Sequence, residues 1–168
     1  MAIREEEYAV LAFAMESTVS DLLARHDYLS PPRVYLLRGE PDLGEGRNDL
    51  IYWWHEAVEK FSHLGNEARI DLLKRSEERE VGFERRKFRE LGLEIGGLSH
   101  NSIPKVAKWS FTLSRAGLDR ENRQAVAHVW AEPECDSRLG AGFVVVAGWS
   151  DAVGTLELLE RVPTGRAR

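Results

Sequence analysis

The N-terminal segment carries apolar side chains at intervals of three and four residues. This spacing places one apolar stripe along one face of a helix, and it predicts a helix over Ile3 to Arg25. The stripe consists of Tyr8, Leu11, Ala12, Met15, Val19, Leu22 and Leu23. Two prolines in the sequence SPPRVYLL then exclude a continuing helix. The apolar run 34–37 predicts a strand inside a sheet, because both of its faces are apolar.

The middle of the chain predicts further helices with more polar character. A second amphipathic helix is expected to begin at Asn48 or Asp49 and to continue through residues 50–64, with Gly65 and Asn66 ending it. Shorter helical segments are expected over residues 67–79 and 83–91. A glycine-rich connector, residues 91–105, closes this part of the chain.

The C-terminal part changes to the alternation and β-branched runs that are typical of strands. Strands are predicted over residues 109–118, 123–131, 143–147 and 155–162. Their short, turn-rich connections favour an antiparallel meander. We therefore expect a single α+β domain over residues 1–163 with a frayed tail at 164–168. A helical N-terminal half would pack on a mainly antiparallel C-terminal sheet of four or five strands.

Composition narrows the classes of partner and compartment. The formal charge is −5 and acids and bases are interspersed, so nucleic acid is not an expected partner. The single cysteine, Cys135, excludes an internal disulfide and a thiolate-rich zinc site. Three glutamates near the N-terminus disfavour a secretory signal. No apolar run approaches the ~20 residues of a membrane helix. We expect a soluble, cytoplasmic protein with no membrane partner.

Residues 110–132 read as a β-hairpin whose two arms are joined by the sequence DREN. A tight connection would pair Ala116 with Ala125 and Thr112 with Val129. One face of the hairpin would then carry small side chains, on which the first helix could dock. The other face would carry Trp109, Phe111, Leu113, Arg115, His128 and Trp130.

The C-terminal half resembles a family of uncharacterised bacterial proteins. The similarity lies in the sequences FTLSRAGLD, QAVAHVWA and LGAGFVVV, with weaker support from EEYAV. The family pattern is Ser-Arg-x-Gly-Phe, a polar turn, Gln-Ala and a glycine-rich turn into an apolar strand. The resemblance implies an antiparallel C-terminal sheet and no known activity. The chain departs from the pattern at Leu118, where phenylalanine is expected, and it has one cysteine in CDSRLGAG rather than two.

Several short patterns have both a functional and a structural interpretation. His55, Glu59 and His63 have a spacing that could present metal ligands, but they lie opposite the apolar cluster of their helix, so a solvated surface is favoured. Acidic neighbours would raise the pKa of Cys135 and disfavour a nucleophile. The sequence GAG at 140–142 precedes a strand and predicts a turn or bulge, and RRKFR at 85–89 predicts a solvated helix face. We expect no metal and no cofactor.

Two classes of function remain. The first is a non-enzymatic binding or interaction module with an unknown protein or small-molecule partner, favoured because no paired catalytic constellation is present and because the chain has five tryptophans. The alternative is a small hydrolase-like or ligand-processing enzyme on the aromatic face of the 109–131 hairpin. The candidate binding residues are Arg115, His128, Trp130 and Trp109. His128 is expected to be neutral with a lowered pKa, and the oligomeric state stays open.

Overall fold

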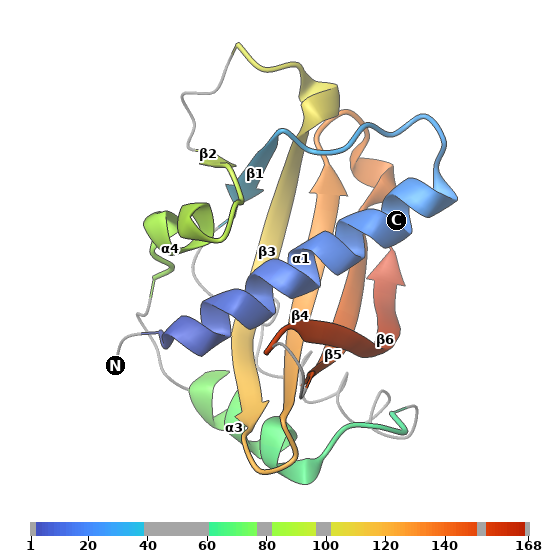
Figure 1. Cartoon of the computed structure of the whole chain (residues 1–168). Helices are drawn as coiled ribbons and strands as arrows, with labels where there is room; N and C mark the ends of the chain where they lie inside the picture. The colour runs from blue at the N-terminus through green and yellow to red at the C-terminus, as the bar shows by residue number, and fades with distance from the viewer. Residues whose placement is uncertain (1–2, 39–60, 77–81, 97–101, 151–153, 167–168) are drawn as a thin grey trace.

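The computed structural model of the chain describes residues 3–38, 61–76, 82–96, 102–150 and 154–166. Its elements are, in chain order, α1 (Glu5–Arg25), β1 (Val34–Leu37), α3 (Asn66–Ser76), α4 (Arg85–Glu90), β2 (Ile95–Gly96), the 3₁₀ helix η1 (Lys105–Ala107), β3 (Lys108–Asp119), β4 (Gln124–Pro133), the 3₁₀ helix η2 (Ser137–Leu139), β5 (Ala141–Trp149) and β6 (Leu156–Arg166). Figure 1 shows α1 lying across one face of the sheet. The predicted α+β class is confirmed.

The strands form one sheet of six in the order β2-β1-β3-β4-β5-β6. The strands from β3 to β6 pair antiparallel as a meander, whereas β1 runs parallel to both β2 and β3. The predicted number of four or five strands is therefore wrong. The sixth strand is β2, which has two residues and lies in the glycine-rich connector, too short to give a periodic pattern.

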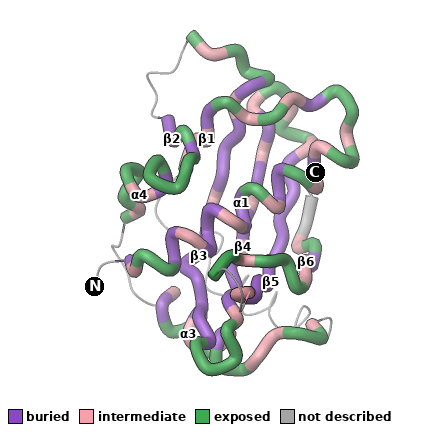
Figure 2. Tube along the Cα trace, in the orientation of Figure 1, coloured by how far each residue is buried: buried purple, intermediate pink, exposed green. Residues whose placement is uncertain are grey.

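Helix α1 packs its predicted apolar stripe on the middle of the sheet. Leu11 and Met15 are fully buried in one cluster with Ala125 and Ala127 of β4. The small side chains of β4 leave room for the helix, so the docking of α1 predicted from the hairpin is found on β4. On β3, Trp109, Phe111 and Leu113 face α1 instead of the small side chains predicted there. Figure 2 shows the buried residues following β3, β4 and β5 beneath α1. No helix in the described segments is both long enough and apolar enough to cross a membrane.

Helix α3 covers the opposite face of the sheet at one end. Ala68 and Leu72 of α3 form a second cluster with Val126, Val144 and Val146, which alternate along their strands with the residues facing α1. Gly117 makes this contact possible. A Cβ on Gly117 would lie 2.0 Å from the Ala68 carbonyl oxygen, so the backbone of α3 can approach β3 only over a glycine.

Helix α4 is attached to α1 through aromatic rings. Phe88 is fully buried and its ring meets the Tyr8 ring edge-on at 5.1 Å between centroids. The Tyr8 hydroxyl accepts a hydrogen bond of 3.0 Å from the Glu84 backbone N–H. Arg85, Arg86 and Arg89 around Phe88 are exposed. The basic run is thus a solvated helix face, as predicted, with one residue anchored in the core.

A buried ion cluster joins α1, α3 and β3 where β3 extends beyond β1. Strand β1 pairs with β3 only as far as Phe111, and among the described residues no strand pairs with the next part of β3 on that side, which we call its open edge. The Glu7 carboxylate, fully buried, receives Arg115 Nε at 2.9 Å and Arg75 Nη1 at 2.8 Å. Asp71 of α3 accepts Arg75 Nε at 2.7 Å and the Leu118 backbone N–H at 2.9 Å. These carboxylates therefore close the open edge of β3.

Other expected boundaries differ from the structure. Of the predicted helix over residues 50–64, residues 50–60 lie outside the described residues, and residues 61–64 are not helical. Of the predicted helical segment 67–79, residues 77–79 lie outside the described residues, and α3 covers the rest. Helix α4 is shorter at both ends than the predicted segment 83–91. Strand β6 continues to Arg166, so residues 164–166, expected in a frayed tail, belong to a strand.

Replacing Glu7 by glutamine is expected to destabilise the protein strongly. The isosteric amide would remove the negative charge that the buried Arg115 and Arg75 guanidinium groups share, and breaking a buried pair in this way typically costs about 3–5 kcal/mol. The free energy of unfolding in urea measures the loss. Glu6→Gln is the matched control, because Glu6 pairs with Arg120 at the surface and such pairs contribute about 1 kcal/mol or less. Equal stabilities of the two variants would contradict the assignment.

Candidate functional site

A β-bulge divides the hairpin into two halves, and the alternating side chains of β3 switch faces of the sheet between the two halves. The predicted pairing of Ala116 with Ala125 is wrong, because Ala116 pairs with Ala127 and the register shifts between Leu113 and Ala116. The extra residue reverses the alternation of β3 relative to β4. At the bulge, the Ser114 hydroxyl accepts the His128 backbone N–H at 2.8 Å and donates to the Arg115 carbonyl oxygen at 2.6 Å.

The bulge separates the four candidate binding residues. Trp109 faces α1, is fully buried and donates its Nε1–H to the Ser30 carbonyl oxygen at 3.2 Å. Arg115 points to the open edge of β3, where it binds Glu7. His128 and Trp130 are half-buried on the face away from α1, on β4. The structure therefore does not bring the four side chains together, and their binding role stays a prediction.

His128 contacts β6 across β5. Its Nε2 lies 3.0 Å from Thr164 Oγ1. Burial lowers the pKa of His128 to about 4, so the imidazole is neutral at pH 7. The predicted direction is confirmed, but its cause is desolvation and not the predicted repulsion by Arg115, which binds Glu7.

Gly142 allows this contact between β4 and β6. It lies inside β5 and is not among the glycines with positive φ, but the ladder with β6 shifts register between Gly142 and Phe143. The extra residue at this shift is Thr164 of β6, because Gly142 pairs with Gly165 and Phe143 pairs with Pro163. The turn or bulge predicted at Gly142 is therefore wrong for Gly142 itself, and the irregularity lies on the neighbouring strand. A Cβ on Gly142 would lie 2.3 Å from Thr164 Oγ1 and 2.9 Å from Trp130 Cε3. Only glycine leaves room for both neighbouring side chains.

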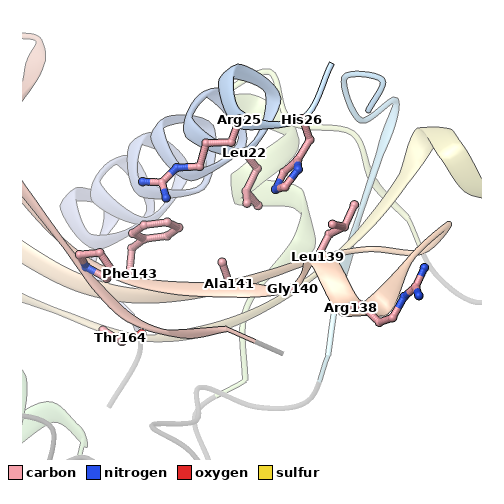
Figure 3. A pocket seen from close by; sticks show the side chains of 10 residues that line it. Leu22, Arg25, His26, Arg138, Leu139, Gly140, Ala141, Phe143 and Thr164 are labelled. Carbon is pink, nitrogen blue, oxygen red and sulfur yellow. The ribbon is translucent and has the colours of Figure 1, made fainter. Parts of the chain in front are cut away.

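An open pocket of about 750 Å³ lies at the other side of the sheet, between the C-terminal end of α1, η2 and the adjoining ends of β5 and β6 (Figure 3). We call it the α1–η2 pocket. It is lined by Leu22, Arg25, His26, Arg138, Leu139, Gly140, Ala141, Phe143, Pro163 and Thr164. These residues come from three separate segments of the chain, so the pocket exists only when α1 is docked on the sheet.

The floor of the pocket is apolar and held in place from one end. Leu22 and Phe143 are each 2% exposed. The guanidinium carbons of Arg25 and Arg161 lie 5.9 Å and 5.5 Å from the centre of the Phe143 ring, within cation–π range. Asp21 binds both arginines, at 2.8 Å each. This clamp joins α1 to β6 above Phe143.

The rim of the pocket carries positive and aromatic groups. Arg138 binds Asp136 through Nε at 2.9 Å and Nη2 at 2.8 Å. The side-chain hydrogen bond from Arg138 lowers the pKa of Asp136, and the backbone N–H of Arg138 caps η2 by donating to the same carboxylate. His26 follows the last residue of α1, and its ring meets the Tyr28 ring edge-on at 5.9 Å. The pocket can therefore combine apolar burial with oriented N–H donors.

The sequence did not identify the polar residues of this pocket. Leu22 and Phe143 were expected only as core residues, and Arg25, His26 and Arg138 have no local spacing that signals a site. The one local signal near these residues is the glycine-rich sequence at 140–142, which predicts a turn or bulge before a strand and not a binding site.

The remaining candidate patterns stay at or near the surface. Cys135 is exposed in the loop before η2. The backbone N–H of His63 donates to Glu160 at 3.2 Å, and His55 and Glu59 lie outside the described residues. Within the described segments, no three His, Cys, Asp or Glu side chains form a group that could hold a metal ion.

Comparison with known proteins finds no matching family model, no matching curated protein and no matching solved structure. The resemblance to an uncharacterised bacterial family therefore stays a prediction from the quoted segments.

Replacing Gly142 by alanine is expected to destabilise the protein by about 1–3 kcal/mol, the usual cost of overpacking a filled site. The added methyl group would force Thr164 and Trp130 apart. Urea unfolding measures the change. Gly82→Ala is the control, because a Cβ there meets no atom within 4 Å. A Gly142→Ala variant as stable as the wild type would show that the contact between β4 and β6 is not constrained there.

His128 is expected to make the protein less stable in mild acid. Its pKa is about 4 when folded against 6.5 when unfolded, so between these values the unfolded chain binds a proton that the folded chain does not. Stability should fall as the pH drops through this window, by at most about 1.4 kcal/mol per pH unit. Unfolding in urea from pH 7.5 to pH 4.5 measures the slope. His128→Gln should flatten it, and an unchanged slope in that variant would contradict the assignment.

Proposed function

We propose that the protein is a non-enzymatic binding module that takes up a small molecule in the α1–η2 pocket. The observation that carries this proposal is the open pocket of about 750 Å³ whose floor is the otherwise buried pair Leu22 and Phe143. Apolar side chains at the floor of an open pocket let a ligand remove its own apolar surface from water.

The size and composition of the pocket support the proposal. Small-molecule sites typically enclose about 300–1,000 Å³ and combine mainly apolar walls with a few polar groups that set orientation. In the α1–η2 pocket, Leu139, Ala141 and Pro163 extend the apolar surface, and Arg138 and His26 stand at the rim. The Asp21 clamp fixes one wall before any ligand arrives, which reduces the ordering cost of binding.

The enzyme alternative has one observation in its favour, the pair formed by His128 Nε2 and Thr164 Oγ1 at 3.0 Å. A hydroxyl beside an imidazole is the geometry of a nucleophile with its base. The pKa of His128 is lowered to about 4, however, and so weak a base removes a hydroxyl proton poorly at neutral pH. The pair is better suited to holding β4 and β6 together across Gly142.

Binding of phenylnaphthylamine, a neutral apolar dye that fluoresces in apolar surroundings, tests the proposal. Titration should give saturable emission with the wild-type protein. Leu139→Trp would fill the pocket from η2, and it is expected to weaken binding at least tenfold, equivalent to ~1.4 kcal/mol. Leu139 is half-buried, so the variant can fold, which thermal unfolding verifies.

Leu91→Trp is the matched control, because Leu91 is an exposed leucine beside α4 and does not line the pocket. It should bind the dye as the wild type does. Equal binding by both variants would place the dye elsewhere and contradict the proposal. Absence of saturable binding to the wild-type protein would do the same.

A further inference from the structure

We infer that the ligand of the α1–η2 pocket carries one anionic head group, such as a carboxylate or sulfonate, on an apolar body. The inference rests on the proposed function and specifies the chemical class of its ligand. It follows from which charges line the pocket, which N–H groups are directed to other partners and what surrounds them.

The charged groups that line the pocket are of one sign. Arg25 and Arg138 contribute guanidinium groups and His26 contributes an imidazole, whereas no aspartate or glutamate is among the described residues that line the pocket. The carboxylates that pair with the arginines, Asp21 and Asp136, are outside this lining. Figure 3 shows Arg25 and His26 above the apolar floor and Arg138 beyond Leu139. The charged side chains that a ligand in the pocket contacts are therefore hydrogen-bond donors.

Each arginine has N–H groups left for a ligand. A guanidinium carries five N–H donors in a planar fork. Arg25 uses Nε and Nη2 toward Asp21, and Arg138 uses Nε and Nη2 toward Asp136. Within the described segments, Nη1 of neither arginine has a protein acceptor among the hydrogen bonds observed. A planar oxyanion can bind the Nη1 edge of each guanidinium group through two parallel hydrogen bonds.

These arginines can also adjust to a ligand at little cost. The Arg138 side chain is 81% exposed and the Arg25 side chain 43% exposed. Ion pairs at such exposed positions are weak, so a ligand oxyanion can share or replace the aspartate. The fully buried Arg115, held by Glu7, has no such freedom.

The surroundings limit the ligand to a low negative charge. Asp21 and Asp136 pair with the arginines, and the C-terminal end of α1 adds a partial negative charge of about half an electron. The whole chain carries −5. These charges repel a polyanion, whereas one oxyanion within hydrogen-bonding distance of either guanidinium group is still attracted. The apolar floor then requires that the rest of the ligand be uncharged.

Two dyes that differ in one charge test the inference. Anilinonaphthalene sulfonate has the skeleton of phenylnaphthylamine with one sulfonate added. It is expected to bind the wild-type protein at least tenfold more tightly than the neutral dye. Arg138→Gln and Arg25→Gln should each weaken binding of the sulfonate at least threefold more than they weaken binding of the neutral dye.

Arg86→Gln is the control, because Arg86 forms an exposed pair with Glu90 four residues away, as Arg25 does with Asp21, but on α4. It should change neither affinity. Equal affinities of the wild-type protein for the two dyes would overturn the anionic head group while leaving the proposed pocket intact. Weakening of the sulfonate by Arg86→Gln as much as by Arg138→Gln would also overturn it. Failure of both dyes to bind would overturn the proposed function together with this inference.

Discussion

The ion pairs of the buried Glu7 carboxylate are the interactions on which the packing of α1, α3 and β3 depends. Moving a carboxylate out of water costs several kcal/mol unless partners replace the lost hydration. Here Arg115 comes from β3 and Arg75 from α3, and both reach Glu7 on α1. The charge can be accommodated only when the three elements are assembled together. The same cluster covers the edge of β3 that β1 leaves open, so it specifies both the packing and the end of pairing at that edge.

The bulge in β3 is the local consequence of that cluster. Arg115 sits at the register shift and points to Glu7 rather than along either face of the hairpin. On one side of the bulge, Trp109 and Phe111 turn toward α1 and fill the space that the small residues of β4 leave. A regular hairpin would have placed these aromatic rings on the face away from α1, beside His128. The same residues of β3 therefore form the hairpin and part of the hydrophobic core.

The α1–η2 pocket lies at the end of α1 away from the ion cluster. Near Glu7 the helix is held tightly to β3, whereas near Arg25 the clamp of Asp21 and Arg161 joins it to β6. Between the helix end and η2 the described side chains leave the α1–η2 pocket open. The pocket is thus a product of two anchors on one helix and of the loop that places Arg138, and none of these is adjacent to the others in the sequence.

The sequence by itself determined the α+β class, the apolar stripe of α1 and the strand at Val34–Leu37, because hydrophobic periodicity depends only on neighbours along the chain. It also indicated that α1 would lie on the small side chains of β4. Tertiary structure decided the hairpin register. The extra residue of the bulge, at Ser114–Arg115, is stabilised by Glu7, which is more than a hundred positions away in the sequence. It also decided the two-residue strand β2 and the pocket. Arg25 and Arg138 have no pattern in common, and only the docking of α1 brings them to one cavity.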